Sequence, residues 1–174
     1  MVESNAQAKV TVKVIECADR IAALDEVMDI MIAAFDPAYG EAWNRAQTQS
    51  MLMLPKTILW LVQCDKPASC NEGLDPNSIG FAITSGHGDE LELMLVAIMP
   101  EWRSRGIGQT LLHAIFQDAR KAGVVKLFVE MRHNNIASSF YDSLGFTRIG
   151  RRKNYYTGTH GQKLDAITMV KAIS

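Results

Sequence analysis

The sequence predicts a single α+β domain, in which a mixed, mostly antiparallel sheet of about seven strands carries helices on both faces. Its segments follow the order strand, two helices, three strands, helix, strand, helix, two strands. Three consecutive strands indicate an antiparallel first part, and the strand–helix–strand unit after them adds a parallel pair. The length of 174 residues fits one such domain with its own core.

Composition narrows the function classes. The chain is 48% hydrophobic and 21% charged, with a net charge of −1, as in an ordinary globular enzyme. This balance argues against a nucleic-acid partner or a membrane partner. Cys17, Cys64 and Cys70 lack CxxC spacing and a nearby histidine cluster, so we expect reduced thiols and no metal site. The chain has neither a signal-peptide pattern nor an apolar run of about 20 residues. We therefore expect a cytoplasmic protein.

The elements before the first hairpin follow from apolar spacing. Residues 1–9 are polar and predict a flexible tail, which leaves a domain over 10–174. Residues 10–15 alternate between apolar and polar side chains and predict a first strand. Apolar side chains recur at helical spacing over 18–35, and a second, short helix is expected over 41–53. A proline follows each helix and ends it.

Three strands come next. Residues 57–63 and 78–85 are apolar and predict paired strands, joined by a surface loop over 65–77 that holds two prolines and a glycine. A turn over 86–89 leads to the central strand, residues 91–98.

The second half alternates helices and strands. A helix that starts after a glycine loop buries one apolar face and ends at Gly123. The mostly apolar segment 124–131 predicts a strand covered on both faces. A short helix over 135–144 and two strands, 146–156 and 165–172, complete the chain.

The glycine loop Arg103-Ser104-Arg105-Gly106-Ile107-Gly108 connects the central strand to the following helix. Unpaired amides and the helix dipole converge at such a helix start, so the loop predicts a phosphate-bearing ligand. It is not the dinucleotide fingerprint, because Leu111 stands where a third glycine or alanine is needed. Nor does the chain contain the Gly-Lys-Ser/Thr of a P-loop.

Three motifs together resemble the GNAT N-acetyltransferases. Arg103-x-x-Gly106-x-Gly108 is similar to the family's acyl-CoA signature. Leu-Phe-Val-Glu130-Met-Arg-His-Asn-Asn135 is similar to its fifth strand, and Ser-Ser-Phe-Tyr141-Asp-Ser-Leu-Gly145-Phe146 to its closing motif. The resemblance covers most of the chain. It implies a GNAT fold whose sheet is splayed at the centre, with acetyl-CoA (coenzyme A) as co-substrate and no metal.

A narrower resemblance is to the ribosomal-protein-alanine N-acetyltransferase group. It is carried by Phe35-Asp36-x-x-x-Gly40-Glu41-Ala42-Trp43, by Glu130-Met-Arg132, and by the segments 151–156 and 165–169. That resemblance implies direct transfer of acetyl to the N-terminal α-amine of a protein, such as a ribosomal protein. The acceptor would be a protein N-terminus or a peptide.

The sequence departs from that group in three places. Met99 stands where the group commonly has an acidic residue, and the loop over 64–77 is longer than usual. The segment from Glu130 to Tyr141 is one residue shorter than the group's pattern. Either Asn134 or Asn135 therefore matches the family asparagine.

The resemblance implies two catalytic residues. Glu130, near the end of a buried strand, would be the general base, acting through water. Its alternative is a structural salt bridge with Arg132 or another cation. Tyr141 would be the general acid that protonates the leaving thiolate. Its alternative is core packing against Phe146.

The resemblance also assigns the co-substrate site. The central strand would bind the pantetheine arm through main-chain groups, one N–H polarising the thioester carbonyl, and the glycine loop would hold the pyrophosphate. An asparagine after the fifth strand would bond the pantetheine. The assigned residues are Val96, Ala97, Ile98, Arg103, Ser104, Arg105, Gly106, Ile107, Gly108, Gln109, Thr110, Asn135 and Tyr141.

Two segments are expected to form the walls of the acceptor site, residues 36–43 and 151–156. The carboxylates of the first segment suit a basic peptide. The aromatic rings of both segments suit the backbone or the first side chain of that peptide. The alternatives are helix capping for the carboxylates and strand packing for the tyrosines. The assigned residues are Asp36, Gly40, Glu41, Trp43, Tyr155 and Tyr156.

Two other functions stay open from the sequence. One keeps the fold but changes the acceptor to a lysine side chain or a small-molecule amine. The other is a non-catalytic acyl-CoA-binding module, against which the presence of both Glu130 and Tyr141 argues. The oligomeric state and the acyl-chain preference are not determined by these patterns.

Overall fold

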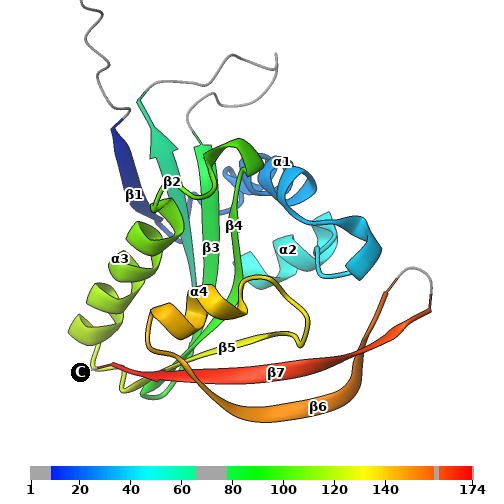
Figure 1. The fold of residues 1–174 in the computed structure, drawn as a ribbon. Helices are drawn as coiled ribbons and strands as arrows, with labels where there is room; N and C mark the ends of the chain where they lie inside the picture. The colour runs from blue at the N-terminus through cyan, green and yellow to red at the C-terminus, as the bar shows by residue number, and fades with distance from the viewer. Residues whose placement is uncertain (1–8, 66–77, 159–160, 174) are drawn as a thin grey trace, which may run out of the picture.

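A computed structural model describes residues 9–65, 78–158 and 161–173. In the described residues, seven strands form one mixed sheet in the order β1-β2-β3-β4-β5-β7-β6. Helices α1 and α2 cover one face and α3 and α4 the other, as Figure 1 shows. The predicted α+β architecture is therefore confirmed. The predicted tail over 1–9 and the loop over 65–77 lie almost wholly outside the described residues.

The first half of the chain forms an antiparallel meander with two helices beside it. Strands β1, β2, β3 and β4 pair in sequence order, each antiparallel to the one before. The elements are β1 (Val10–Ile15), α1 (Leu24–Ala34), the 3-10 helix η1 (Pro37–Tyr39), α2 (Arg45–Leu52), β2 (Thr57–Cys64), β3 (Ser78–His87) and β4 (Glu90–Ile98).

The second half adds a parallel strand and a long hairpin. Strand β5 runs parallel to β4, and β7 inserts antiparallel between β5 and β6. In Figure 1 this hairpin crosses below the helices and ends beside the loop between α1 and α2. The elements are η2 (Pro100–Trp102), α3 (Ile107–Lys121), β5 (Lys126–Arg132), α4 (Ser138–Ser143), β6 (Thr147–Thr157) and β7 (Lys163–Ala172).

The starts of the three shorter helices differ from the prediction. The helix expected from residue 18 begins at Leu24, after a turn. The helix expected from residue 41 begins at Arg45, because Asn44 caps it: Asn44 Oδ1 accepts from the Gln47 amide at 3.0 Å, and Gln47 Oε1 accepts from the Asn44 amide at 2.9 Å. The helix expected from residue 135 begins at Ser138, where the Asn135 side chain caps the preceding turn.

The core lies on both faces of the central strands. Leu59, Leu61, Phe81 and Ile83 are fully buried against α1. The side chains that alternate with them face α3 and join its apolar stripe. On that face the buried Trp60 indole N–H donates to Thr84 Oγ1 at 3.1 Å, so its polar group is satisfied. Alternation in β2 and β3 therefore fills two layers at once.

The sheet opens between β4 and β5. The two strands pair only from Glu90 to Leu93, opposite residues 126–129. On its other edge β4 carries a bulge, since Thr84 faces Leu93 but Ile83 faces Leu95, which leaves Met94 as an extra residue. A bulge bends its strand, and residues 96–98 are paired with β3 alone. The splay that the family resemblance implied is present.

Candidate functional site

The glycine loop places the start of α3 beside the open end of β4. Gly106 has φ of +77° and precedes the first helical residue, Ile107, whose side chain is buried. No side chain caps this helix start, so its first-turn N–H groups remain available to an anion. A Cβ on Gly108 would lie 3.4 Å from Phe140 Cζ, an ordinary contact, so α3 and α4 lie next to each other here.

The two arginines of the loop have contacts of their own. Arg103 Nε donates to the Ile98 carbonyl at 3.0 Å and its Nη2 to the Ala34 carbonyl at 2.6 Å. Arg103 thereby ties the end of β4 to the end of α1. The Arg105 guanidinium lies 5.0 Å from the centroid of the Trp102 ring. Both side chains therefore have partners next to the loop, and Arg103 also holds β4 against α1.

Glu130 lies near the end of β5, next to the opening of the sheet. Its Oε2 accepts from Arg152 Nη2 and from Thr168 Oγ1, the latter at 3.3 Å. The Glu130 side chain is 16% exposed and that of Arg152 is 56% exposed. The Arg152 guanidinium also lies 3.9 Å from the Tyr155 ring centroid. The cation beside Glu130 is therefore Arg152, and the suggestion of Arg132 was wrong.

Tyr141 is buried on α4. Its ring meets Phe146 edge-on at a centroid distance of 5.4 Å, so the predicted core packing is confirmed for the ring. Burial first, and then the charge of Glu41, raise the pKa of Tyr141 far above its ordinary value. The phenol therefore keeps its proton across the physiological range.

Glu41 occupies the centre of a polar network on the acceptor side. Its Oε2 accepts from Arg132 Nε at 3.0 Å and its Oε1 from Asn135 Nδ2 at 3.1 Å. Glu41 and Arg132 are 15% and 9% exposed at the side chain. Helix capping, the alternative for Glu41, was wrong, because its partners come from β5 and the turn after it.

The other residues of the first wall have mainly structural contacts. Asp36 Oδ1 accepts from the Ala38 amide at 2.9 Å, which confirms helix capping for this residue. Gly40 has φ of +64°, a left-handed conformation that favours glycine. Trp43 is half-buried and packs against the core beside α1.

The second wall meets the first. Tyr155 and Tyr156 contact each other edge-on at 5.1 Å. Burial, then the charges of Glu130 and Glu41, raise the pKa of Tyr156 well above its ordinary value. Both of these carboxylates therefore contribute to the shift of the Tyr156 pKa. Gln162 Nε2 donates to the Ala38 carbonyl at 3.3 Å and joins the two walls.

The two candidate asparagines differ in their partners. Asn134 accepts from Arg132 Nη1 through both its backbone oxygen and its Oδ1, at 2.9 and 2.8 Å. Asn135 uses Nδ2 on Glu41 and Oδ1 on the Ala137 amide. Only Asn135 therefore links the turn after β5 directly to the acceptor wall.

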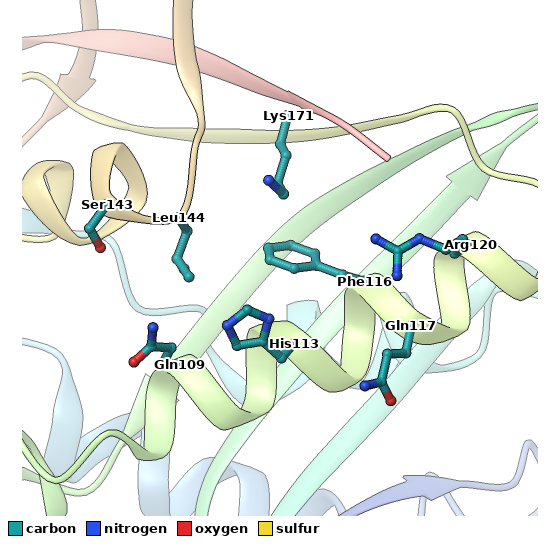
Figure 2. A pocket seen from close by; sticks show the side chains of 8 residues that line it. All are labelled: Gln109, His113, Phe116, Gln117, Arg120, Ser143, Leu144 and Lys171. Carbon is teal, nitrogen blue, oxygen red and sulfur yellow. The ribbon is translucent and has the colours of Figure 1, made fainter. Parts of the chain in front are cut away.

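The described surface has two notable hollows. One, of about 360 Å³, lies over β4, β5 and β7 and is lined by Glu130, Arg152 and Thr168 together with Glu90 and Glu92. The other, of about 300 Å³, lies between α3, α4 and the end of β7 (Figure 2). Its lining includes His113, Arg120 and Lys171 but no carboxylate, so its charge suits an anion. Only the first hollow contains a predicted catalytic side chain.

Sequence reasoning missed three contributors to the centre. Arg132 is the partner of Glu41, Tyr39 lies under the Arg132 guanidinium at 3.7 Å, and Thr168 bonds Glu130. One signal was available, because residues two apart in a strand face the same side and Arg132 therefore shares a face with Glu130. Nothing local could have indicated Tyr39 or Thr168.

Two further features, a metal-ligand cluster and a membrane-spanning helix, are absent from the described residues. They contain no group of three or more histidine, cysteine, aspartate or glutamate side chains placed to hold a metal ion. Within the same residues, no helix is both long enough and apolar enough to cross a bilayer.

The chain is similar to known acetyltransferases in sequence and in structure. Residues 58–148 match a family model described as an acetyltransferase (GNAT) domain. The [ribosomal protein bS18]-alanine N-acetyltransferase of Escherichia coli K12 is 40% identical over 95 residues, or 54% of this chain and 64% of the relative. The match thus spans less than two thirds of that protein. The Salmonella typhimurium protein of the same name is 39% identical over 101 residues, 58% of this chain and 68% of the relative.

Structural similarity extends further along the chain. The crystal structure of the ribosomal-protein-S18-alanine N-acetyltransferase from Escherichia coli superposes with a TM-score of 0.76 at 29% identity. The superposition covers 95% of each chain.

Proposed function

Because this chain belongs to the GNAT acetyltransferase family, we propose that it transfers acetyl from acetyl-CoA directly to the N-terminal α-amine of a protein. A ribosomal protein is the acceptor class that the relatives' names suggest. The observation that carries the proposal is the opening of the sheet at β4 and β5. The anion-binding loop lies at the open end of β4, and Glu130 and Tyr141 lie on the elements across the opening.

The residues at this opening fit acetyl-CoA. The first turn of α3 has N–H groups without a side-chain cap, which suit the pyrophosphate. Residues 96–98 have one strand edge without a β5 partner, which suits the amide-rich pantetheine arm. Asn135 borders the same opening at the start of the turn after β5. Acetyl-CoA supplies the activated thioester, and the chain positions it.

Glu130 is proposed as the general base. An N-terminal ammonium must lose a proton before its nitrogen can attack, and a carboxylate at the end of β5 can receive that proton directly or through water. Arg152 and Thr168 hold this carboxylate from one side through Oε2. Both contacts use Oε2, so Oε1 can serve the amine or a bridging water.

Tyr141 is proposed as the general acid. The departing thiolate needs a proton, and a tyrosine phenol, which is protonated at neutral pH, can donate one. The buried ring, packed on Phe146, fixes the direction of the hydroxyl. The acid therefore lies on α4 and the base on β5, so the two roles fall to separate side chains.

The acceptor would enter between the walls that Gln162 and Ala38 join. Glu41, Tyr155 and Tyr156 line this entrance with one carboxylate and two phenols. Such groups suit a cationic N-terminus and the first peptide bonds behind it. A cytoplasmic location belongs to the same proposal and rests on the sequence patterns described above.

Two substitutions test the catalytic roles. Glu130→Gln and Tyr141→Phe should each lower kcat by about 10²–10⁴-fold, the usual contribution of general acid–base catalysis. The dissociation constant for coenzyme A, measured by calorimetry, should stay within about twofold for both variants, because Glu130 is not among the co-substrate residues and Tyr141→Phe keeps the aromatic ring in that site. Wild-type turnover in both variants would remove these two residues from the mechanism.

A second experiment tests the acceptor. Acetyl-CoA turnover is measured by mass spectrometry against peptides with free N-termini, against the same peptides blocked at the N-terminus but carrying a lysine, and against polyamines. The proposal expects acetylation of the free α-amine only. Equal or faster modification of lysine or polyamine would replace the proposed acceptor, and coenzyme A binding without any transfer would indicate a binding module.

A further inference from the structure

The network around Glu41 connects two segments far apart in the chain. Glu41 belongs to the loop between α1 and α2, whereas Arg132 and Asn135, 91 and 94 residues later, belong to the end of β5 and the turn after it. Both carboxylate oxygens of Glu41 are engaged, one by each partner. Glu41 therefore fastens the loop both to the end of β5 and to the turn after it.

Arg132 is itself held from three directions. Its Nη1 donates to the backbone oxygen and Oδ1 of Asn134, at 2.9 and 2.8 Å, and its Nε donates to Glu41. The Tyr39 ring lies 3.7 Å from the guanidinium carbon. Tyr39 and Glu41 are two residues apart in the acceptor wall, so Arg132 contacts that wall through two of its side chains.

Stability alone is a poor reason for this arrangement. Removing two charges from water is costly, and a buried ion pair often stabilises a protein no more than apolar side chains of equal volume. Here the arginine is 9% exposed and the glutamate 15%. The pair does fix geometry, because the planar guanidinium restricts the direction of each donor.

The position of Glu41 gives that geometry a use. Glu41 belongs to the wall expected to receive the acceptor, and its charge contributes to the raised pKa of both Tyr141 and Tyr156. A carboxylate offers about four lone-pair sites, of which two are taken by Arg132 and Asn135. The remaining sites can accept from an ammonium or a peptide N–H of the acceptor.

We propose that Arg132 is a positioning residue of the acceptor site: it holds Tyr39 and Glu41 against the end of β5 so that Glu41 meets the acceptor in a fixed place. Asn135 supports the same carboxylate from the other side. Arg132 itself contacts neither acceptor nor acetyl-CoA. The inference rests on the proposed transfer to an N-terminal amine.

The test compares steady-state constants for an acceptor peptide and for acetyl-CoA. Arg132→Met should raise the acceptor KM by roughly 10–100-fold, the range expected for losing a charge-assisted hydrogen bond. The KM for acetyl-CoA should change less than about twofold, because the glycine loop is untouched. Arg132→Lys keeps the charge but not the planar fork, so it should restore only a small part of the acceptor affinity.

A double variant shows whether Arg132 acts through Glu41. If it does, Arg132→Met combined with Glu41→Gln should raise the acceptor KM no more than the stronger single change. The control is Arg45→Met, which breaks the exposed Arg45–Asp25 pair at 2.5 Å and should leave both KM values unchanged. Thermal unfolding of every variant identifies any that fails to fold. If Arg132→Met fails to fold, Arg132→Lys and Glu41→Gln provide the comparison instead.

The outcomes separate this role from the proposed function. Normal acceptor KM in Arg132→Met and Arg132→Lys, with an active wild type, overturns the positioning role alone. So does an equal rise in both KM values with additive effects in the double variant, which is the pattern of general structural damage. A wild type that transfers acetyl to no N-terminal amine overturns the proposed function and this role together.

Discussion

Two phenols in the proposed reaction centre have raised pKa values and stay protonated. Tyr141 and Tyr156 both have raised pKa values, with burial as the first cause in each case. The neighbouring carboxylates add to the shift, since a negative charge disfavours a phenolate. Protonated phenols can donate hydrogen bonds or a proton at neutral pH, which is the state that the proposed chemistry uses.

These shifts predict a loss of stability at alkaline pH. In the unfolded chain a tyrosine ionises near pH 10, whereas the native state keeps Tyr141 and Tyr156 protonated above that value. The unfolded state then binds fewer protons than the native state, so stability falls as pH rises above about 10. Each phenol contributes at most about 1.4 kcal/mol per pH unit. Urea unfolding at several pH values measures this slope.

The matching variant carries Tyr141→Phe and Tyr156→Phe. It should lose stability less steeply than the wild type above pH 10, while the two proteins behave in parallel between pH 7 and 9. Parallel curves above pH 10 as well would show that these phenols ionise alike in both states.

Single residues also show which parts of the site could be predicted from the sequence. Glu130 was predicted as the general base mainly from the family resemblance, with its place near the end of a buried strand as support. Its cation was not predicted, because Arg152 lies on β6, and β6 reaches β5 only through β7. Which side chains meet across two strands depends on registers that a single sequence does not reveal.

The elements themselves were easier to predict than their ends. β1 was predicted with its observed bounds, because alternation and the flanking polar residues agree there. The start of α2 was misplaced, although Asn44 and Gln47 form a capping box that the sequence displays. Apolar periodicity sets where an element runs, and capping side chains set where it begins. Residues 41–43 were predicted as helical because none of them excludes a helix.

Two glycines of the cofactor loop should respond differently to alanine. Gly106 has φ of +77°, where an L-residue is strained, so Gly106→Ala should lower the unfolding free energy by about 1–2 kcal/mol. Gly108 lies inside α3, and its added Cβ would meet Phe140 at 3.4 Å, an ordinary contact. Gly108→Ala should therefore be neutral, or stabilising by up to about 1 kcal/mol through helix propensity.

Urea unfolding of the two alanine variants distinguishes these effects. Gly108→Val serves as the packing control, because its larger side chain must displace Phe140 and separate α3 from α4. Equal stability of Gly106→Ala and Gly108→Ala would contradict the backbone argument.

At the scale of the whole molecule, the chain consists of two halves that share a short seam. The meander β1 to β4 and the group β5 to β7 are joined in the sheet only by residues 90–93 and 126–129. Further contacts between the halves include α3 with α4 at Gly108 and Phe140, and Glu41 with Arg132 and Asn135. The proposed reaction centre lies at this opening, so both substrates would bind where the halves separate.

This arrangement predicts where coenzyme A should slow hydrogen exchange. The backbone of residues 96–98 lacks a partner on the β5 side, and the first turn of α3 lacks a cap, so both have amides that are open to water. A ligand bridging the opening should protect these two segments most, and β1 at the far edge of the sheet least. Coenzyme A at a concentration of 100 Kd should also stabilise the native state by about 2.7 kcal/mol, which raises the melting temperature. Exchange followed by mass spectrometry with and without coenzyme A measures the pattern. Uniform protection along the chain, or none at 96–98, would mean that the ligand does not occupy the opening between β4 and β5.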